Sequence, residues 1–267
     1  MTEFTTSEFI TVDDPVDKIR RITLNRPEKR NAINNGMRRE LFAALEAGDA
    51  DDAVHATIIR GSGPCFSAGY DLKATAEEKP YYTAEGDGMW SRHVTEGWTR
   101  MWDLAKPVIA QVHGYAMAGG TELVAACDLV YVAHDATFSY PVVRVISPPD
   151  FQYHPWLVGM RNAMELVLMG DPITGDDAVR IGLANRAFPA EELDEKVLTM
   201  AGRLAGVPAE LLQINKRSVH RAMEIMGIRT GVRAGSELQG LATQLPSVRA
   251  LLKGDAIAAV KDASQSQ

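Results

Sequence analysis

The chain has 267 residues, enough to bury a large hydrophobic core in one large domain, alone or with an appendage. Hydrophobic residues make up 46% and charged residues 24%, as in ordinary globular proteins, and a net charge of −7 argues against nucleic acid as the main partner. Two cysteines are too few for a disulfide scaffold, and neither a signal-peptide pattern nor an apolar run of about 18 residues occurs, so we expect a reduced, cytoplasmic protein with no membrane partner.

The first predicted elements alternate between strand and helix. Residues 19–24 and 54–60 mix apolar and polar side chains with partial alternation, which is typical of strands. Between them, apolar residues recur at helical spacing over 37–45 and predict an amphipathic helix that ends near Gly48. The acidic residues 49–52 then predict a solvated turn. This order of elements indicates an α/β fold.

A glycine-containing loop follows the second strand. It covers residues 65–73, Cys-Phe-Ser-Ala-Gly-Tyr-Asp-Leu-Lys, and loops directly after strands are where α/β proteins often carry their chemistry. A helix is predicted next over residues 90–102, with Trp90, Trp98 and Trp102 on one face. That aromatic face can belong to the core or form the wall of an acyl pocket.

A second unit of strand, glycine turn and helix lies in the middle of the chain. The apolar run 107–112 leads into a turn at Gly119 and Gly120, where the missing side chains allow a close approach of a ligand to the backbone. The helix after the turn begins with unsatisfied N–H groups and a partial positive charge, which suit an anionic oxygen. Glu122 lies one turn into this helix. Donors for a developing oxyanion beside a proton-transfer group are what acyl chemistry requires.

The remainder of the chain is predicted to be mainly helical. One more strand is expected at 129–133, and an irregular segment at 145–154 follows it. Thr174 and Asp177 form a capping-box pattern at the start of a short helix. Helices are predicted over residues 161–169, 176–181, 191–204, 208–226 and 232–245. Strands and helices therefore alternate to about residue 190, and a helical region follows.

Several standard catalytic motifs are absent from the sequence. The run Gly61-Ser62-Gly63 lacks the third glycine of a dinucleotide fingerprint, and the loop before Glu122 lacks the lysine of a phosphate-binding loop. No Gly-x-Ser-x-Gly or His-Glu-x-x-His motif occurs, so neither a serine triad nor a metal centre is expected. The two glycine loops predict two backbone N–H groups aimed at one carbonyl. The alternative is two tight turns with a solvated Glu122.

The two loops resemble the signature of the crotonase, or enoyl-CoA hydratase/isomerase, family. The resemblance covers roughly residues 15–225 and is carried by residues 24–32, 66–73, 106–128 and 175–185. It implies an α/β fold in which residues 1–205 form a spiral of ββα units with two roughly perpendicular sheets. A C-terminal helical region, residues 206–267, would mediate trimer formation. A homotrimer or a dimer of trimers is the implied assembly.

The resemblance also implies roles for the residues of the two loops. In this family two backbone N–H groups hold the thioester carbonyl of an acyl-CoA, and they would be those of Tyr70 and Gly119. The CoA moiety would contact the first loop, with the adenine at the Ala68 carbonyl and the phosphates near Lys73. The implied CoA-binding residues are Ala68, Gly69, Asp71, Leu72 and Lys73. CoA would enter as part of the substrate, with no separate cofactor and no metal.

The acidic residues depart from the hydratase pattern of the family. Two glutamates flank a water in those enzymes; Glu122 matches the first, but Val142 stands at the second position, and Val cannot move a proton. Asp150 lies near the position where dienoyl-CoA isomerases and a dehalogenase of the family place a catalytic aspartate. Its alternative role is that of a turn-forming aspartate. Further residues that can shape the site are Tyr140, Tyr153 and His154.

The predicted function is that of an acyl-CoA thioester enzyme. Hydration or dehydration of a 2-enoyl-CoA, as in fatty acid metabolism, is the leading reaction because Glu122 is retained. Glu122 would transfer the proton, and Asp150 would be a second acid or base. The alternatives are isomerisation of an enoyl-CoA or dienoyl-CoA, and acyl-CoA binding without efficient hydratase activity.

Overall fold

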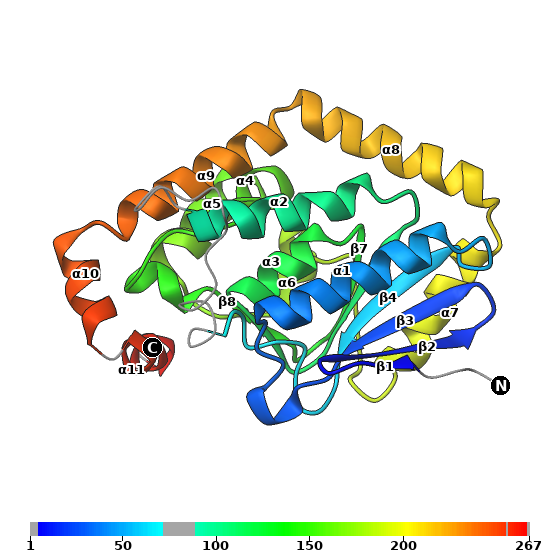
Figure 1. Ribbon diagram of the computed structural model, residues 1–267, viewed down its shortest axis with the longest axis horizontal. Helices are drawn as coiled ribbons and strands as arrows, with labels where there is room; N and C mark the ends of the chain where they lie inside the picture. The colour runs from blue at the N-terminus through cyan, green and yellow to red at the C-terminus, as the bar shows by residue number, and fades with distance from the viewer. Residues whose placement is uncertain (1–4, 72–88, 255, 266–267) are drawn as a thin grey trace.

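The structure is a computed structural model that describes residues 5–71, 89–254 and 256–265. Strands and helices alternate through the first 190 residues, and helices follow (Figure 1). The strands are β1 (Thr5–Thr6), β2 (Ile10–Val16), β3 (Ile19–Leu24), β4 (Ala56–Gly61), β5 (Val108–Val112), β6 (Tyr115–Met117), β7 (Leu129–Ala133), β8 (Thr137–Ser139), β9 (Ile173–Thr174) and β10 (Arg186–Phe188). The helices are α1 (Asn35–Ala50), α2 (Met89–Asp103), α3 (Gly119–Ala126), α4 (His154–Leu157), α5 (Gly159–Met169), α6 (Gly175–Ile181), α7 (Leu193–Ala205), α8 (Ala209–Ile225), α9 (Ile228–Ala242), α10 (Pro246–Lys253) and α11 (Ala256–Gln265), with 3-10 turns η1 (Pro27–Lys29) and η2 (Pro141–Arg144).

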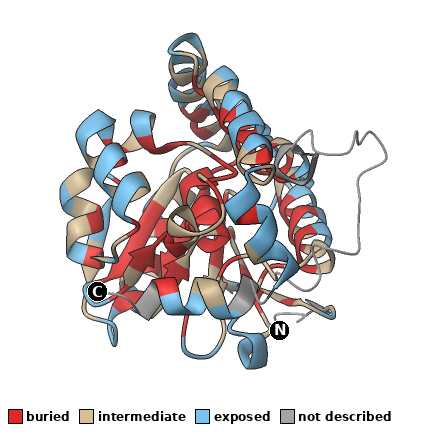
Figure 2. Ribbon diagram, turned by 90° about the vertical axis from the view of Figure 1, so that its left-hand side faces the viewer, coloured by how far each residue is buried: buried red, intermediate tan, exposed pale blue. Residues whose placement is uncertain are grey.

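The larger sheet has seven strands in the order β1-β2-β3-β4-β5-β7-β10. The pairs β1–β2 and β2–β3 are antiparallel, and all pairs from β3 to β10 are parallel. Every residue of β5 is buried, as expected for a central parallel strand that is covered on both faces. The red strands at the centre of Figure 2 show this buried core.

A smaller sheet and a buried helix form the part of the fold that carries the site. β6 pairs with β8 in parallel, and β8 pairs with β9 in antiparallel fashion. All eight residues of α3 are buried, which is possible because the helix has small or apolar side chains on every face except at Thr121 and Glu122. α3 therefore presents its N-terminus inside the protein.

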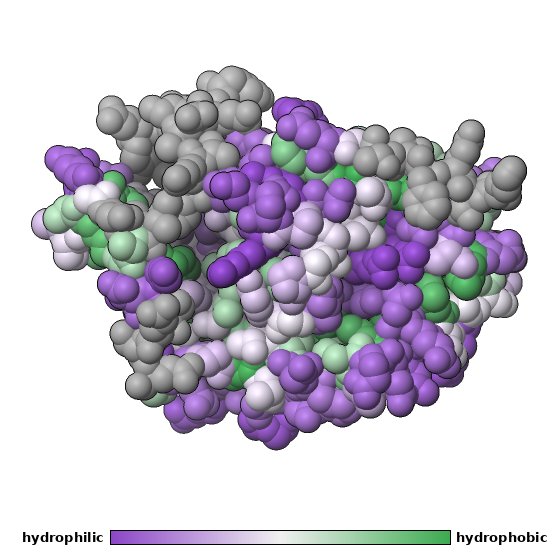
Figure 3. All heavy atoms as spheres, turned by 90° about the horizontal axis from the view of Figure 1, so that it is seen from below, coloured by the Kyte–Doolittle hydropathy of each residue, from purple (hydrophilic) through white to green (hydrophobic). Residues whose placement is uncertain are grey.

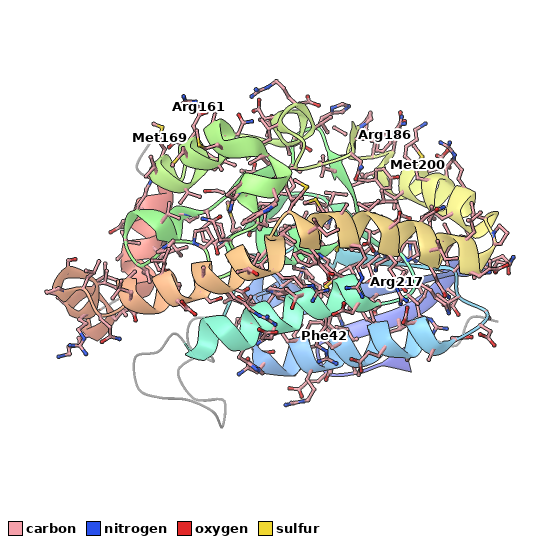
Figure 4. All side chains as sticks on the ribbon, turned by 90° about the horizontal axis from the view of Figure 1, so that it is seen from above. Phe42, Arg161, Met169, Arg186, Met200 and Arg217 are labelled. Carbon is pink, nitrogen blue, oxygen red and sulfur yellow. The ribbon has the colours of Figure 1, made fainter. Side chains whose placement is uncertain are left out.

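The C-terminal helices cover the core from one side. α8 and α9 run above α2 in Figure 1, and α10 and α11 lie at the far end of the molecule. Seen from above, Phe42 of α1 points toward α2, where its ring centroid lies 5.7 Å from that of Trp98 (Figure 4). α9 is joined to α2 by ion pairs between Arg229 and Asp103 and between Arg233 and Glu96.

α8 is anchored to the core by a buried ionic cluster. Lys216 Nζ lies 2.8 Å from Asp128 Oδ2 and donates to the carbonyls of Met101 and Lys106, both at 3.0 Å. His220 Nε2 lies 2.7 Å from the other oxygen of Asp128. Three donors on the ammonium group thus have three acceptors, which a buried lysine requires.

The structure confirms most of the predicted elements and corrects some of them. The acidic turn at 49–52 is not simply solvated: α1 extends to Ala50, and the Asp49 carboxylate accepts from the backbone N–H groups of Ala105 and Lys106 at 3.1 and 2.8 Å. The helix predicted over 232–245 runs instead from Ile228 to Ala242. The capping box of Thr174 and Asp177 is present.

The surface and the helices can be compared with the prediction that the protein has no membrane partner. The face seen from below in Figure 3 is largely hydrophilic, with hydrophobic side chains in small separate areas. No helix in the described parts of the chain combines the length and the apolar character needed to cross a membrane.

Candidate active site

The two glycine loops lie side by side, as the sequence predicts. Ser67 and Ala116 form an isolated parallel bridge, in which Ser67 N–H donates to the Tyr115 carbonyl at 3.1 Å and Met117 N–H donates to the Ser67 carbonyl at 3.0 Å. Ser67 Oγ also donates to the Asn31 carbonyl at 2.8 Å. The first loop is therefore fixed to the segment that leads into α3.

Two glycines are needed for this close approach of the loops. Gly69 has a φ of +93°, and an ideal Cβ at this residue would lie 2.7 Å from the Met117 carbonyl oxygen and 3.3 Å from Gly119 N. An ideal Cβ at Gly120 would lie 2.9 Å from the Ser67 carbonyl oxygen. Any larger residue would push the loops apart.

The backbone around the loops places the two expected N–H donors. Gly119 is the first residue of α3, so the helix itself offers no acceptor for its N–H. Tyr70 forms a parallel bridge with Ile33, in which the Gly69 carbonyl and the Asp71 N–H make the hydrogen bonds to Ile33. The N–H of Tyr70 itself therefore points away from Ile33.

Ala118, between the loops and the helix, adopts an unfavourable backbone conformation. Its φ is 44° and its ψ is −112°, a region that residues with a side chain rarely enter. Its N–H donates to the Ser139 carbonyl at 2.9 Å, which holds the residue in place. Such strain costs of order 1–3 kcal/mol and is commonly found where function requires a specific geometry.

Glu122 is the centre of the site. Its side chain is completely buried, and its carboxylate accepts three hydrogen bonds. Tyr140 O–H and Phe151 N–H donate to Oε1, the latter at 3.0 Å, and Tyr70 O–H donates to Oε2. Glu122 is thus neither solvated nor merely a helix-start residue, and the alternative that left it in solvent is wrong.

Burial and a neighbouring acid control the charge of Glu122. Its pKa is raised from 4.5 to about 8: burial raises it most and the charge of Asp150 raises it as well, whereas the bonds from Tyr140, Tyr70 and Phe151 lower it. The result is a carboxyl group that titrates close to physiological pH. Acids and bases of this kind are suited to proton transfer.

Asp150 lies beside Glu122, as the sequence predicts for a second acid. The residue is 7% exposed, and the N–H of the next residue, Phe151, is one of the three donors to Glu122. The Asp150 backbone carbonyl accepts from Thr95 Oγ1 of α2 at 3.0 Å and lies 3.4 Å from Ser236 Oγ of α9. Two helices therefore fix the segment that carries Asp150.

The side chain of Tyr70 lies across the site. Its hydroxyl accepts from Trp98 Nε1 at 2.8 Å and donates to Glu122. Its ring lies against Gly119: an ideal Cβ there would have three ring carbons within 2.5 to 2.6 Å. Trp98 and Trp102 of the predicted aromatic face are buried in the core, and Trp98 also reaches the site; the side chain of Trp90 lies outside the described part of the structure.

Tyr140, which contacts Glu122, packs with His154, and His154 packs with Tyr153. The Tyr153 and His154 rings stack with centroids 4.0 Å apart, and burial lowers the pKa of His154 from 6.5 to about 3. The Tyr153 hydroxyl is buried and has no hydrogen-bond partner among the described residues. A cavity of about 20 Å³ adjoins the three side chains, enough for about one water.

The predicted CoA-binding residues lie in the first loop. Gly69 is buried and Ala68 half-buried, with the Ala68 N–H donating to the Arg30 carbonyl at 2.9 Å. The Asp71 carboxylate pairs with Arg26 Nη1 at 3.1 Å. Leu72 and Lys73 lie outside the described residues.

Val142 remains half-buried in the 3-10 turn η2 (Pro141–Arg144) and offers no proton-transfer group. Its carbonyl accepts the N–H groups of Ile146 at 2.8 Å and of Val145 and Ser147 at 3.2 Å. The hydrogen bond that this turn supplies to Glu122 comes from Tyr140, two residues earlier.

Sequence reasoning missed three groups that contact or orient Glu122. It assigned only the N–H of Tyr70, whereas the phenol of Tyr70 touches the carboxylate; it did not place Trp98 on that phenol, nor Phe151 N–H on the carboxylate. An aromatic residue between Gly69 and Asp71 is the one sequence signal that could have drawn attention to the first contact.

No group of three or more His, Cys, Asp and Glu side chains in the described part of the chain could hold a metal ion.

Comparisons with known proteins agree with this geometry. The family model described as enoyl-CoA hydratase/isomerase matches residues 16–254. EchA13 of Mycobacterium tuberculosis is 37% identical over 246 residues, which cover 84% of this chain and 76% of that protein. The mitochondrial enoyl-CoA hydratase of Pongo abelii is 34% identical over 207 residues, covering 76% of this chain and 69% of the relative.

Among solved structures, the enoyl-CoA hydratase of Mycobacterium smegmatis is similar to this chain with a TM-score of 0.86 and 30% identity. The similarity covers 97% of this chain and 92% of the other.

Proposed function

We infer the function from one premise: the chain belongs to the enoyl-CoA hydratase/isomerase family. We propose that it acts on the acyl group of a CoA thioester and that the two loops form an oxyanion hole. The N–H groups of Tyr70 and Gly119 would donate to the thioester carbonyl oxygen. As negative charge develops on that oxygen, preorganised donors stabilise the enolate, and one such donor is worth about 3–4 kcal/mol.

The reaction that we propose is hydration of a 2-enoyl-CoA and its reverse. The observation that carries it is the buried, hydrogen-bonded carboxyl of Glu122, one turn after Gly119, with Asp150 beside it. Glu122 would take a proton from water as the water oxygen bonds to C3. The resulting enolate would then take a proton at C2 from one of the two acids. Asp150 would supply the second acid that Val142 cannot.

A second candidate, double-bond isomerisation, is favoured by the contacts of Glu122. Both of its oxygens accept hydrogen bonds from protein groups while no substrate is bound, so a reactive water would have to compete with these donors for the carboxylate. Moving a proton from one carbon to another needs a single base and no water.

A spectroscopic assay distinguishes the two reactions. A hydratase removes the conjugated absorbance of a 2-enoyl-CoA because water adds across the double bond. An isomerase generates that absorbance from a 3-enoyl-CoA. Glu122→Gln should lower the rate of either reaction by about 10²- to 10⁴-fold, the usual contribution of a general acid or base, and leave CoA-thioester binding intact. If turnover persists unchanged in this variant, the assigned role of Glu122 is wrong.

A third possibility, acyl-CoA binding without turnover, is tested by the same panel. Calorimetric binding of acyl-CoA combined with no change in either absorbance assay would support it. Absence of any CoA or acyl-CoA binding would refute all three forms of the proposal.

We also propose that the chain assembles as a trimer or a dimer of trimers. Large hydrophobic side chains are exposed on α5, α8 and α9, and such groups commonly mark contact surfaces. They include Met160, Met164, Leu168, Met169, Ile214, Ile225, Leu238 and Leu241. Figure 4 shows Met169 on α5 at the edge of the molecule. A monomeric mass by light scattering at micromolar concentration would contradict this proposal.

A further inference from the structure

The phenol of Tyr70 fills the path between the expected oxyanion donors and the acid. Its ring lies against the Cα of Gly119, and its hydroxyl reaches Glu122 Oε2, so one side chain spans the distance from the start of α3 to the carboxylate one turn later. A thioester bound by the N–H groups of Tyr70 and Gly119 would need the same space for its acyl carbons. The substrate and this position of the ring are therefore mutually exclusive.

We propose that the Tyr70 side chain is a gate, which the acyl group of the substrate displaces from Gly119 and Glu122 and whose ring sets the width of acyl group that the site admits. This proposal rests on the proposed function, because it assumes that an acyl-CoA thioester is the ligand.

Two hydrogen bonds to described residues hold the gate closed. Trp98 Nε1–H donates to the phenol oxygen at 2.8 Å, and the phenol O–H donates to Glu122. Trp98 is buried in the core, and Glu122 is buried in α3, so both contacts lie on rigid parts of the protein. Tyr70 lies between Gly69 and Asp71, which both form backbone hydrogen bonds with Ile33. Its own backbone therefore cannot move far. Opening must consequently be a rotation of the side chain.

Displacement of the gate also prepares the acid. While the gate is closed, the bond from Tyr70 is one of three that favour the charged form of Glu122. When the phenol leaves, Glu122 Oε2 loses this donor and becomes able to exchange a proton with substrate. The acyl group would thus free the Glu122 carboxylate from Tyr70 as it binds. The carboxylate would be available for proton transfer only when a substrate is present.

The gate lowers the apparent affinity of the protein for any acyl-CoA. If only a fraction of molecules is open, the measured Kd is the intrinsic Kd divided by that fraction. Tyr70→Phe removes both hydrogen bonds and keeps the ring, so the open fraction should rise. We expect about tenfold tighter binding of butyryl-CoA to this variant. Tyr70→Ala removes the ring as well and should in addition admit isobutyryl-CoA and other branched acyl groups.

Two matched variants separate the gate from a general effect on Glu122. Trp98→Phe removes one of the bonds to the phenol without touching Glu122, and it should tighten binding by a smaller factor. Tyr140→Phe removes a phenol from the other oxygen of Glu122. The three atoms nearest to an ideal Cβ at Gly119 all belong to Tyr70 and none to Tyr140. Tyr140→Phe should therefore not tighten binding.

The experiment is calorimetric titration of the wild type and the four variants with butyryl-CoA and isobutyryl-CoA, on proteins whose thermal melts show them folded. The gate is supported if the thioesters bind more tightly to Tyr70→Phe and Tyr70→Ala than to the wild type, while Tyr140→Phe shows no such gain. It is also supported if binding is detected only for the two Tyr70 variants. Equal or weaker binding to Tyr70→Phe, with a wild type that binds, overturns the gate and leaves the proposed function standing. If no protein binds either thioester, the proposed function falls and the gate falls with it.

Discussion

Two buried groups with opposite pKa shifts make the stability of this protein depend on pH in a specific way. Burial, with a smaller effect of the Asp150 charge, raises the pKa of Glu122 from 4.5 to about 8. Burial lowers the pKa of His154 from 6.5 to about 3. Both side chains are almost inaccessible, 0% and 3% exposed, so solvent screening weakens these effects little. The prediction concerns the replacement Glu122→Gln.

The sign of each contribution follows from which state holds the proton. Between pH 4.5 and about 8 the folded protein keeps a proton on Glu122 that the unfolded chain has released, so the free energy of unfolding falls by about 1.4 kcal/mol per pH unit. Between pH 3 and 6.5 the unfolded chain protonates His154 and the folded protein does not, so the free energy rises by about the same amount per unit. The two slopes cancel from pH 4.5 to 6.5.

Above pH 6.5 only the Glu122 contribution remains. Wild-type protein should therefore lose about 2 kcal/mol of its free energy of unfolding between pH 6.5 and 8 through this group. Glu122→Gln should lose none of it, and from pH 5 to 6.5 it should gain about 2 kcal/mol because the His154 slope is no longer opposed. Urea melts at constant ionic strength and protein concentration measure both intervals.

Glu210→Gln is the matched control, since this glutamate is exposed on α8. It should follow the wild-type pH dependence. If Glu122→Gln loses as much stability as wild type between pH 6.5 and 8, Glu122 does not titrate in this range and the argument from its burial is wrong.

Three further predictions concern residues around the site and the anchor of α8. Asp150→Asn removes a like charge, so the pKa of Glu122 should fall from about 8 toward its ordinary value and the limb of the pH–rate profile should move to lower pH; an unmoved limb would exclude the coupling. Ala118→Gly should stabilise the fold by about 1 kcal/mol in urea melts, because glycine tolerates a φ of 44°; a loss of stability would show that the conformation is not strained. Lys216→Met should cost about 3–5 kcal/mol because it removes the ammonium group from the Asp128 carboxylate and the donor from two backbone carbonyls, and a change below 1 kcal/mol would show that the cluster does not hold α8.

The sequence predicts the backbone of the site because that part depends on local pattern. Gly69, Gly119 and Gly120 stand where the loops touch, and the apolar run before them forms β5. Glu122 lies on the first turn of α3, as spacing alone requires. The sequence does not predict β1, β6, β8, β9 and β10, since two or three residues are too few to show a periodicity, and it also misses β2 (Ile10–Val16), a strand of seven residues.

The environment of Glu122 could not be predicted in the same way. Its hydrogen-bond partners come from positions 52, 18 and 29 residues away, namely Tyr70, Tyr140 and Phe151, and no local pattern reports such contacts. The Tyr70 hydroxyl also accepts from Trp98 Nε1 of α2, 28 residues away in the sequence. Asp150 was placed near the site only through the family resemblance, because its segment has no regular structure.

The hydrogen bonds of the Asp150 backbone carbonyl limit where the chain can be truncated without loss of contacts in the site. It joins Thr95 of α2 and Ser236 of α9, residues that are 141 positions apart and whose hydroxyls also lie 2.9 Å from each other. A shortened protein that ends before α9 would therefore lose a hydrogen bond within the wall of the site as well as an exposed helix. The C-terminal helices are, at this point, part of the candidate site, and a graft of residues 1–205 alone would lack the Ser236 contact to it.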